Sequence, residues 1–374
     1  MKILFNCLTL EKGGAERVIT TIANELIKKN DITILTLKKS DVMYKVDNKI
    51  KILTVDKKNY HLCNKITNKL KKFSIIRLFK MKKIVLNEKP DVIISFLPEP
   101  SLRIAFLKKV SRKINKIPTI ISIRNDPNVE YHNFLLRKIT KHLYSKINGF
   151  VFQTNDAKGY FKALLKREDN MVVIPNPING RFLVDKYFDG ERKKEIVTVG
   201  RLEKQKNHML LIDAFYDFSK KYNDYKLYIY GDGSLKEDLK NHIKELKIGN
   251  KVFLMGQVDD VKKHIYDSSV FVLSSDYEGM PNALMEATAL GIPCIATDCP
   301  CGGARDLINN NKNGILISPK CEKELYEAIV KIVDDSNLQL EFSKNGIENS
   351  KKYRIDKILI LWEKIIEKIT TRGE

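Results

Sequence analysis

The chain has 374 residues, more than one ordinary domain, and its 43% apolar content is enough for sizeable cores. No apolar run approaches the roughly 20 residues of a membrane-spanning helix. The segment 1–10 lacks the basic region and cleavage site of a signal peptide, so we expect a cytoplasmic protein of two domains.

The excess positive charge belongs to the first half of the chain. Residues 1–190 hold 38 Lys and Arg against 17 Asp and Glu, a net charge of +21, whereas residues 191–374 hold 29 of each. This asymmetry predicts that the first half alone meets a phosphate-rich partner. An anionic membrane surface and nucleic acid are the two candidates, and no helix-turn-helix, zinc or RNA-binding signature supports the second.

The first half reads as alternating strands and helices. Strands are expected at 2–8, 31–37, 50–55, 91–96, 119–123, 150–153 and 171–174, and the first helix at about 15–29. Strands that are apolar throughout are typical of a parallel sheet covered on both faces. Gly13 and Gly14 lie at the first strand-to-helix turn, where glycine lets the backbone approach a ligand, but they do not complete G-x-G-x-x-G.

A lysine-rich stretch covers residues 62–86. Leu70, Phe73, Ile76 and Phe79 recur there at helical spacing. Lysines interleave with them, and we assign four to a membrane or acceptor surface: Lys69, Lys72, Lys80 and Lys83. A basic amphipathic helix with aromatic residues is typical of a membrane-surface element. The alternative is a helix that faces the core and has a solvated basic back.

The second half repeats the pattern after Pro175-Asn176-Pro177, and residues up to 192 are expected to be a linker. Strands are expected at 195–199, 227–230, 252–254, 270–273, 293–296 and 315–317, and a final helix at 356–370. Arg201 follows the first of these strands and Lys206 lies five residues later. A guanidinium fork and an ammonium at the carboxyl end of a parallel strand can hold a diphosphate from two sides. Two exposed surface cations are the alternative.

The segment 274–303 carries the most specific pattern. A turn at Glu278 and Gly279 follows a strand, and a helix is expected from Pro281 to Leu290, where Gly291 ends it.

The amides of Asn282, Ala283 and Leu284 at this helix N-terminus predict an anion site. Glu278 and Glu286 flank it, which suits a sugar nucleotide: one carboxylate can bind ribose hydroxyls and the other the transferred sugar. A lone pair of glutamates at this spacing is equally consistent with a capped helix that carries two solvated side chains.

The segment E-G-M-P-N-A-L-M-E-A at 278–287 resembles the donor-site signature of retaining glycosyltransferases of family 4, which have the GT-B fold. G-G-A-E-R at 13–17 and G-R-L-E-K-Q-K-N at 200–207 resemble further segments of that family, so the resemblance covers most of the chain. The first of these and the 278–286 segment resemble a subgroup that includes N-acetylgalactosaminyltransferases extending undecaprenyl-diphosphate oligosaccharides.

The resemblance implies an α/β fold of two doubly wound Rossmann-like domains that face each other across a cleft. Residues 1–180 would form the acceptor and membrane domain, 181–355 the donor domain, and 356–374 a helix that crosses back to the first domain. The activity implied is retaining transfer of a hexose or N-acetylhexosamine from a UDP-sugar to a lipid-linked saccharide, in surface polysaccharide synthesis. The protein would act peripherally on the inner face of the plasma membrane.

The resemblance and the spacing together give a set of donor-binding residues: Gly13, Gly14, Arg201, Lys206, Gly231, Gln257, Val258, Glu278, Gly279, Met280, Pro281, Asn282, Ala283, Leu284 and Glu286. Of these, Glu278 is expected nearest the reacting sugar. Many family members also carry a histidine after the strand at 119–123, and this chain does not. Either Arg124, Asn125 or Asp126 replaces that sugar contact or it is missing, so we keep Asn125 and Asp126 as catalytic candidates and Arg124 on the acceptor side.

No D-x-D triplet occurs in the chain. Arg201, Lys206 and the helix N-terminus can stabilise the departing diphosphate, so neither a metal nor a cofactor is expected. Two other functions stay open. A UDP-sugar epimerase of the same fold would turn over without an acceptor, and a nucleic-acid-binding protein would lose affinity steeply with salt.

Overall fold

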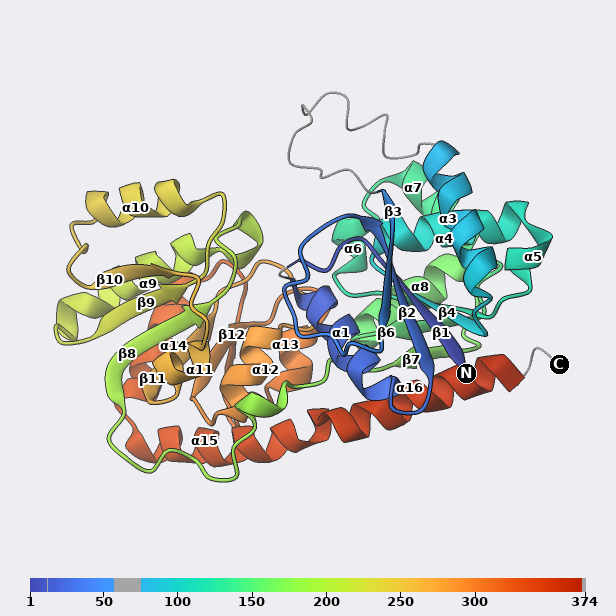
Figure 1. Cartoon of the computed structure of the whole chain (residues 1–374). Coiled ribbons are helices and arrows are strands. Elements are labelled where there is room, and N and C mark those ends of the chain that lie inside the picture. Colours follow the sequence, from blue (N-terminus) through green and yellow to red (C-terminus); the bar gives the residue numbers. More distant parts are fainter. Residues whose placement is uncertain (12, 57–74, 372–374) are drawn as a thin grey trace. The chain divides into compact units, whose positions relative to one another are not determined.

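The computed structural model describes residues 1–11, 13–56 and 75–371 (Figure 1). The chain divides into two compact units, Met1–Pro177 with Ile355–Glu374, and Ile178–Arg354. Each unit is a parallel sheet covered by helices, as the apolar strands predicted.

The first unit contains a seven-stranded parallel sheet in the order β3-β2-β1-β4-β5-β6-β7. Its strands are Lys2–Cys7 (β1), Asp31–Lys38 (β2), Lys51–Asp56 (β3), Val92–Phe96 (β4), Thr119–Ser122 (β5), Gly149–Phe152 (β6) and Met171–Val173 (β7). Ile3 in the centre pairs with Ile32 on one side and Val92 on the other. Every strand boundary lies within one residue of its predicted position.

Helices cover both faces of this sheet. One face packs against α1 (Gly14–Leu26) and α16 (Ile355–Thr370), in a core that includes Phe5 and Ile94. The other packs against α3 (Ile75–Glu88), α4 (Pro98–Val110) and α5 (Arg112–Asn115), in a core that includes Leu4 and Ile93. The remaining helices are α6 (Pro127–Glu130), α7 (Phe134–Tyr144) and α8 (Asn155–Leu165).

The final helix α16 belongs to the first unit although it follows the second in sequence. Its apolar residues recur every three or four positions and are buried: Ile358, Trp362, Ile365, Ile366 and Ile369. The Trp362 indole is fully buried and stacks on Phe96 of β4, with 6.0 Å between ring centroids. Core burial of this stripe is what holds the end of the chain on the first sheet.

The second unit contains a six-stranded parallel sheet in the order β10-β9-β8-β11-β12-β13. Its strands are Lys193–Val199 (β8), Lys226–Tyr230 (β9), Val252–Gly256 (β10), Ser268–Leu273 (β11), Cys294–Thr297 (β12) and Ile315–Ile317 (β13). Its helices are α9 (His208–Lys221), α10 (Lys236–Glu245), α11 (Val261–Ile265), α12 (Asn282–Ala289), α13 (Gly303–Leu307), α14 (Glu322–Val333) and α15 (Ser336–Ser350).

The segment 178–192 corrects one prediction, because it is no free linker. Ile178 and Phe182 are buried in the core of the second unit. The partly buried Arg192 donates hydrogen bonds to the carbonyls of Ser268 (3.0 Å) and Gly291 (2.6 Å). The segment therefore packs on the second unit near both of its ends, although Asp185, Lys186 and residues 189–191 between them are exposed.

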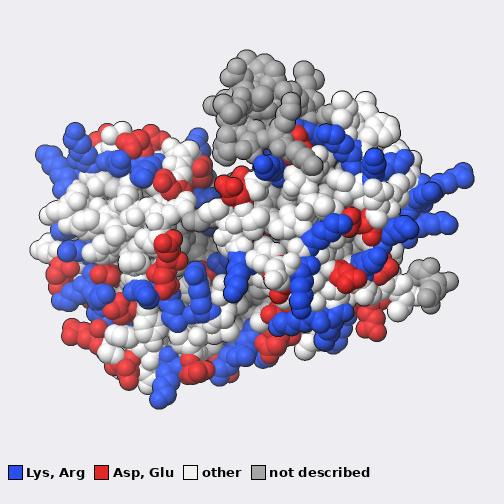
Figure 2. Space-filling view, viewed as in Figure 1, with Lys and Arg blue, Asp and Glu red and all other residues white. Residues whose placement is uncertain are grey.

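The predicted basic helix is described only from Ile75, and Lys69, Lys72, Leu70 and Phe73 lie outside the described residues. One side of α3 is core, with Leu78, Met81 and Val85 buried. The other side is open: Ile75, Ile76 and Phe79 are 66–69% exposed, beside the exposed Lys80 and Lys83. Figure 2 shows lysine and arginine side chains along the outer edge of this unit, at the positions of α3 and α5 in Figure 1.

Candidate active site

The candidate site lies where the strand order of the second sheet reverses. β8 and β11 are neighbours, but the next strand after β8 lies on one side of this pair (β9) and the next strand after β11 lies on the other (β12). Ligands of open α/β sheets bind outside the carboxyl ends of the strands at such a reversal, because the two following connections diverge there. The loops 200–207 and 274–281, predicted to bind the donor, both start at this point.

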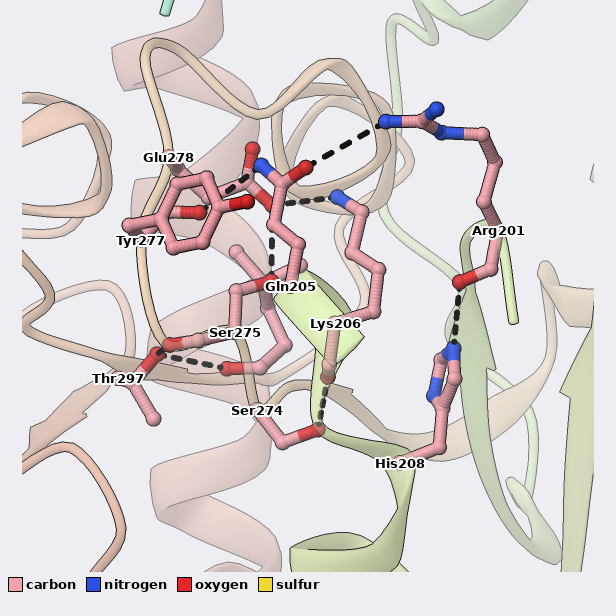
Figure 3. Close-up of polar contacts among 10 residues, drawn as sticks. Arg201, Gln205, Lys206, His208, Ser274, Ser275, Tyr277, Glu278 and Thr297 are labelled. Carbon is pink, nitrogen blue, oxygen red and sulfur yellow. Dashed lines mark hydrogen bonds and ion pairs between the residues drawn. The ribbon is translucent and has the colours of Figure 1, made fainter. Parts of the chain in front are cut away.

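Lys206 and Glu278 form an ion pair at the centre of these loops, through Nζ and Oε1 (Figure 3). Their side chains are 14% and 8% exposed. The Ser275 hydroxyl donates a second hydrogen bond to the same Glu278 oxygen at 2.8 Å. The structure therefore brings together two residues that the sequence assigned to different parts of a donor, the diphosphate and the sugar.

Several hydrogen bonds fasten the two loops to each other. The Asp276 amide donates to the Gln205 carbonyl (2.9 Å), and the Gln205 side chain donates to the Tyr277 carbonyl (2.9 Å). Asn207 Nδ2 donates to the Asp276 carboxylate at 2.9 Å. Fixed loops of this kind hold charged side chains in place before a ligand arrives, which is how a site becomes preorganised.

Arg201 lies at the open side of the site. Its side chain is exposed, and Nη2 donates a long hydrogen bond of 3.4 Å to Gln205 Oε1. Its backbone is held more firmly than its side chain. His208 Nε2 lies 3.2 Å from the Arg201 carbonyl, and because a carbonyl only accepts, Nε2 carries the proton. Burial lowers the pKa of His208 to about 4, so the imidazole is neutral at physiological pH.

The helix α12 begins one residue later than predicted. Pro281 has extended backbone and is the cap, and its carbonyl accepts from the Met285 amide at 3.1 Å. The first turn contains the amides of Asn282, Ala283 and Leu284 and has no acidic side chain. The positive end of the helix dipole therefore lies directly after the Glu278–Gly279 turn. Gly291, at φ +69°, follows the helix as expected.

Glu286 lies in the second turn of α12 and is 5% exposed. This burial argues against the alternative from the sequence, a capped helix that carries two solvated glutamates. Like Glu278, it is held inside the protein beside the helix N-terminus.

Glycines let neighbouring backbones support these loops. A Cβ on Gly231, whose φ is +140°, would lie 1.9 Å from the Gly200 carbonyl oxygen. A Cβ on Gly303 would lie 1.7 Å from the Gly279 carbonyl oxygen. Gly231 thus packs against the Arg201 loop, and the segment after β12 packs against the Glu278 turn.

Gln257 and Val258 follow the edge strand β10, two strands from β8. Gln257 is exposed, and Val258 packs partly against the core.

The first unit holds the other predicted residues. Gly13 caps α1, and the Tyr44 hydroxyl accepts from its amide (3.1 Å) and donates to its carbonyl (2.9 Å). Asp126 is 1% exposed and caps α6, accepting from the Asn128 amide at 2.9 Å, so its carboxylate shapes the loop. Asn125 is half-buried. Arg124 is 8% exposed, so it does not belong to the exposed basic surface of Lys80 and Lys83.

The sequence did not point to Gln205, Asn207, His208, Ser275 or Tyr44. Two of them, Asn207 and His208, could have been found from the sequence. Asn is a common N-cap residue, and Asn207 directly precedes the first residue of the helix that follows the Arg201 loop, His208. In the described part of the chain, no group of three or more His, Cys, Asp or Glu side chains could hold a metal ion.

Comparison with known proteins identifies the family. Residues 12–181 match the family described as "Glycosyltransferase Family 4" and residues 182–349 the one described as "Glycosyl transferases group 1". An α-1,4-N-acetyl-D-galactosaminyltransferase of Campylobacter jejuni, which acts on an undecaprenol-linked diphosphate glycan, is 30% identical over 99% of both chains. An Escherichia coli galactosyltransferase named for UDP-Gal and diphosphoundecaprenol-linked GlcNAc is 27% identical over 80% of this chain and 81% of its own length.

Solved structures agree on the fold. HepE of Anabaena in complex with UDP superposes with a TM-score of 0.81, covering 98% of this chain and all of HepE at 16% identity. This confirms the predicted GT-B architecture of two Rossmann-like domains. The chain belongs to glycosyltransferase family 4 and is a glycosyltransferase.

Proposed function

We propose that this glycosyltransferase moves a hexose or N-acetylhexosamine, with retention of configuration, from a UDP-sugar to a lipid-linked saccharide during surface polysaccharide synthesis. The contact between Lys206 and Glu278 at the strand reversal carries the proposal. A cation suited to phosphate and a carboxylate suited to sugar hydroxyls touch each other there. Their meeting point is where a donor would place the bond between its diphosphate and its sugar, which is the bond that transfer breaks.

The departing UDP carries the charge that the site must stabilise. Lys206, the exposed Arg201 and the amino end of α12 are three positive groups around this point. Preorganised donors of this kind contribute about 10²–10³-fold each in rate. Ser275 holds the Glu278 carboxylate in position to meet sugar hydroxyls.

The names of the relatives support the donor and the acceptor. The Campylobacter and Escherichia coli proteins act on undecaprenyl-diphosphate saccharides, and the latter is named for a UDP-sugar. The basic first unit fits an acceptor that carries a diphosphate and lies at a membrane.

A donor screen tests the proposal. The purified protein is incubated with single UDP-sugars, with and without a prenyl-diphosphate saccharide, and UDP release is measured. We expect release to rise at least tenfold with acceptor for one donor. Conversion of the UDP-sugar to its epimer without acceptor would establish the alternative function instead.

We also propose that the protein attaches peripherally to the inner face of the plasma membrane through α3 and α7. Both helices pack on α4 in the first unit. In α7, Phe134, Leu135 and Ile139 are 65%, 63% and 43% exposed, beside the exposed Arg137, Lys138 and Lys141, and the helix has no acidic residue.

Apolar side chains among cations suit insertion between anionic headgroups, where each Lys or Arg contributes roughly 1 kcal/mol. Among the helices of the described residues, none has the length and apolarity to cross a bilayer.

Vesicle flotation tests this attachment. The protein should float with vesicles that contain anionic lipid, remain behind with neutral ones, and detach as salt is raised. Charge reversal at Lys80 and Lys83, with Phe79→Ser and Phe134→Ser, should abolish flotation. Reversal at Lys240 and Lys323, exposed on the second unit, is the control and should have no effect. Equal flotation of both variants would place the attachment elsewhere.

A further inference from the structure

Arg124 in the first unit is a buried cation with an unused hydrogen-bonding edge. It follows the carboxyl end of β5 and is 8% exposed. Nη1 donates to Asn176 Oδ1 at 2.8 Å. Nε and Nη2 have no acceptor among the described residues, although both atoms are buried.

These two nitrogens are the pair that matters for ligand binding. Nε–H and the neighbouring Nη2–H point the same way from the planar guanidinium, so together they fit two oxygens of one carboxylate or phosphate. Arg167 in the same unit uses this edge: its Nε and Nη2 donate to the two Asp169 oxygens at 3.0 and 2.8 Å.

A partly buried arginine of the second unit, Arg192, gives a contrast. Arg192 donates from both Nη groups to three carbonyls and the Ser343 hydroxyl. A guanidinium with a structural role thus has protein acceptors for the hydrogens of both Nη groups. Arg124 receives no such set of acceptors.

Two aromatic rings lie beside Arg124. Its Cζ lies 5.0 Å from the Phe96 ring centroid and 5.6 Å from that of Trp362. Trp362 Nε1 and the hydroxyl of Ser122, the last residue of β5, are also buried without a partner among the described residues. Aromatic faces stabilise the cation in part.

No carboxylate is paired with this cation within the described residues, and burial lowers the pKa of Arg124 to about 9. A buried charge normally has a counter-charge, because the cost of its desolvation is otherwise uncompensated.

We propose that the Nε–Nη2 edge of Arg124 binds two oxygens of a phosphoryl group on a ligand that enters at the carboxyl edge of the first sheet. The site rests on the geometry of this unit alone. Only the carrier of the phosphoryl group rests on the proposed function, which offers two sources, the prenyl diphosphate of the acceptor and the UDP of the donor.

Tryptophan fluorescence of the full-length protein tests the site directly, because Trp362 is the only tryptophan in the chain. Its emission should change saturably when inorganic phosphate is added, and should stay unchanged with chloride at the same ionic strength. Arg124→Lys keeps a basic side chain but loses the two-donor edge, so it should weaken the phosphate response at least tenfold. Arg167→Lys, whose edge already holds Asp169, should respond like wild type.

Two further arms identify the source. If Arg124→Lys weakens farnesyl diphosphate binding while UDP binding is unchanged, the acceptor supplies the phosphoryl group, and the reverse ranking assigns it to the donor. An Arg201→Ala variant should lose UDP affinity yet keep the phosphate response of Trp362, so failure of the donor site and of this site are distinguishable.

A phosphate response that is missing in wild type, or equal in Arg124→Lys, would overturn the proposal. If Arg124→Lys does not fold, the Nε–H resonances of ¹⁵N-arginine in wild-type protein decide instead. One slowly exchanging resonance should shift with phosphate, and no shift would reject the site.

Discussion

Lys206 and Glu278 lie 72 residues apart in the sequence and form an ion pair in which both side chains are largely buried. The pair is stabilising only as long as it is complete, since a buried charge without its partner is costly. The contribution of the Lys206–Glu278 pair to stability can therefore be measured separately from its contribution to transfer.

Glu278→Ala should therefore destabilise the second unit by about 3–5 kcal/mol, the usual cost of removing one partner of a buried pair. Replacing both residues by methionine should restore most of the lost unfolding midpoint. It should not restore turnover. Glu168→Ala, which breaks exposed pairs with Lys158 and Lys162, is the control and should leave the midpoint nearly unchanged. A double variant as unstable as Glu278→Ala would contradict this account.

The two buried glutamates should differ in what they bind. We expect Glu286→Ala to weaken UDP binding, because its carboxylate is assigned to ribose. Glu278→Ala should abolish turnover and leave UDP affinity close to wild type, because the ammonium of Lys206 remains for the diphosphate. Isothermal titration calorimetry with UDP decides this, and the opposite ranking would exchange the two roles.

Arg201→Ala and Lys206→Ala should each lower turnover by about 10²-fold or more, the usual scale for one electrostatic donor. The measurement is UDP release at saturating donor. Lys204→Ala on the same loop, with an exposed side chain, is the control. Activity within a few-fold of wild type in either variant would remove that residue from the site.

Transfer should be independent of divalent metal. The sequence has no D-x-D triplet, and the positive groups around the Lys206–Glu278 pair can stabilise the departing diphosphate. EDTA should leave the rate unchanged. Strong inhibition that Mg²⁺ or Mn²⁺ reverses would show that these groups are insufficient.

Much of the fold could be predicted from the sequence, because parallel strands buried on both faces read as short apolar runs. The predicted boundaries of β13 match the structure at both ends, and those of β11 differ by at most two residues. The loop 178–192 was misjudged, since an irregular strap that buries Ile178 and Phe182 has no periodicity to detect.

The candidate residues of the site could be chosen from the sequence, but the contacts between them could not. Arg201, Lys206, Glu278 and Glu286 were recognisable from motif and position. The ion pair depends on β8 and β11 being neighbours, which strand order decides and local sequence does not. The contact between the Tyr44 hydroxyl and Gly13 was also not predictable. The two residues are 31 positions apart, and Tyr44 lies in a segment without regular structure.

The neutral His208 gives a prediction about pH. Its pKa is about 4 in the folded protein and near 6.5 when unfolded, because burial disfavours the imidazolium. The unfolded chain therefore binds the proton first. Stability from this group is complete above pH 6.5 and is lost as the pH falls towards 4, by about 3 kcal/mol in total.

Urea unfolding between pH 7 and pH 4.5 measures this, with His208→Gln as the comparison. Glutamine keeps a donor for the Arg201 carbonyl but cannot titrate, so the variant should lose less stability on acidification than wild type. His142→Gln, exposed on α7, controls for the general effect of removing a histidine and should follow wild type. Parallel curves for wild type and His208→Gln would mean that His208 does not set the acid sensitivity of this loop.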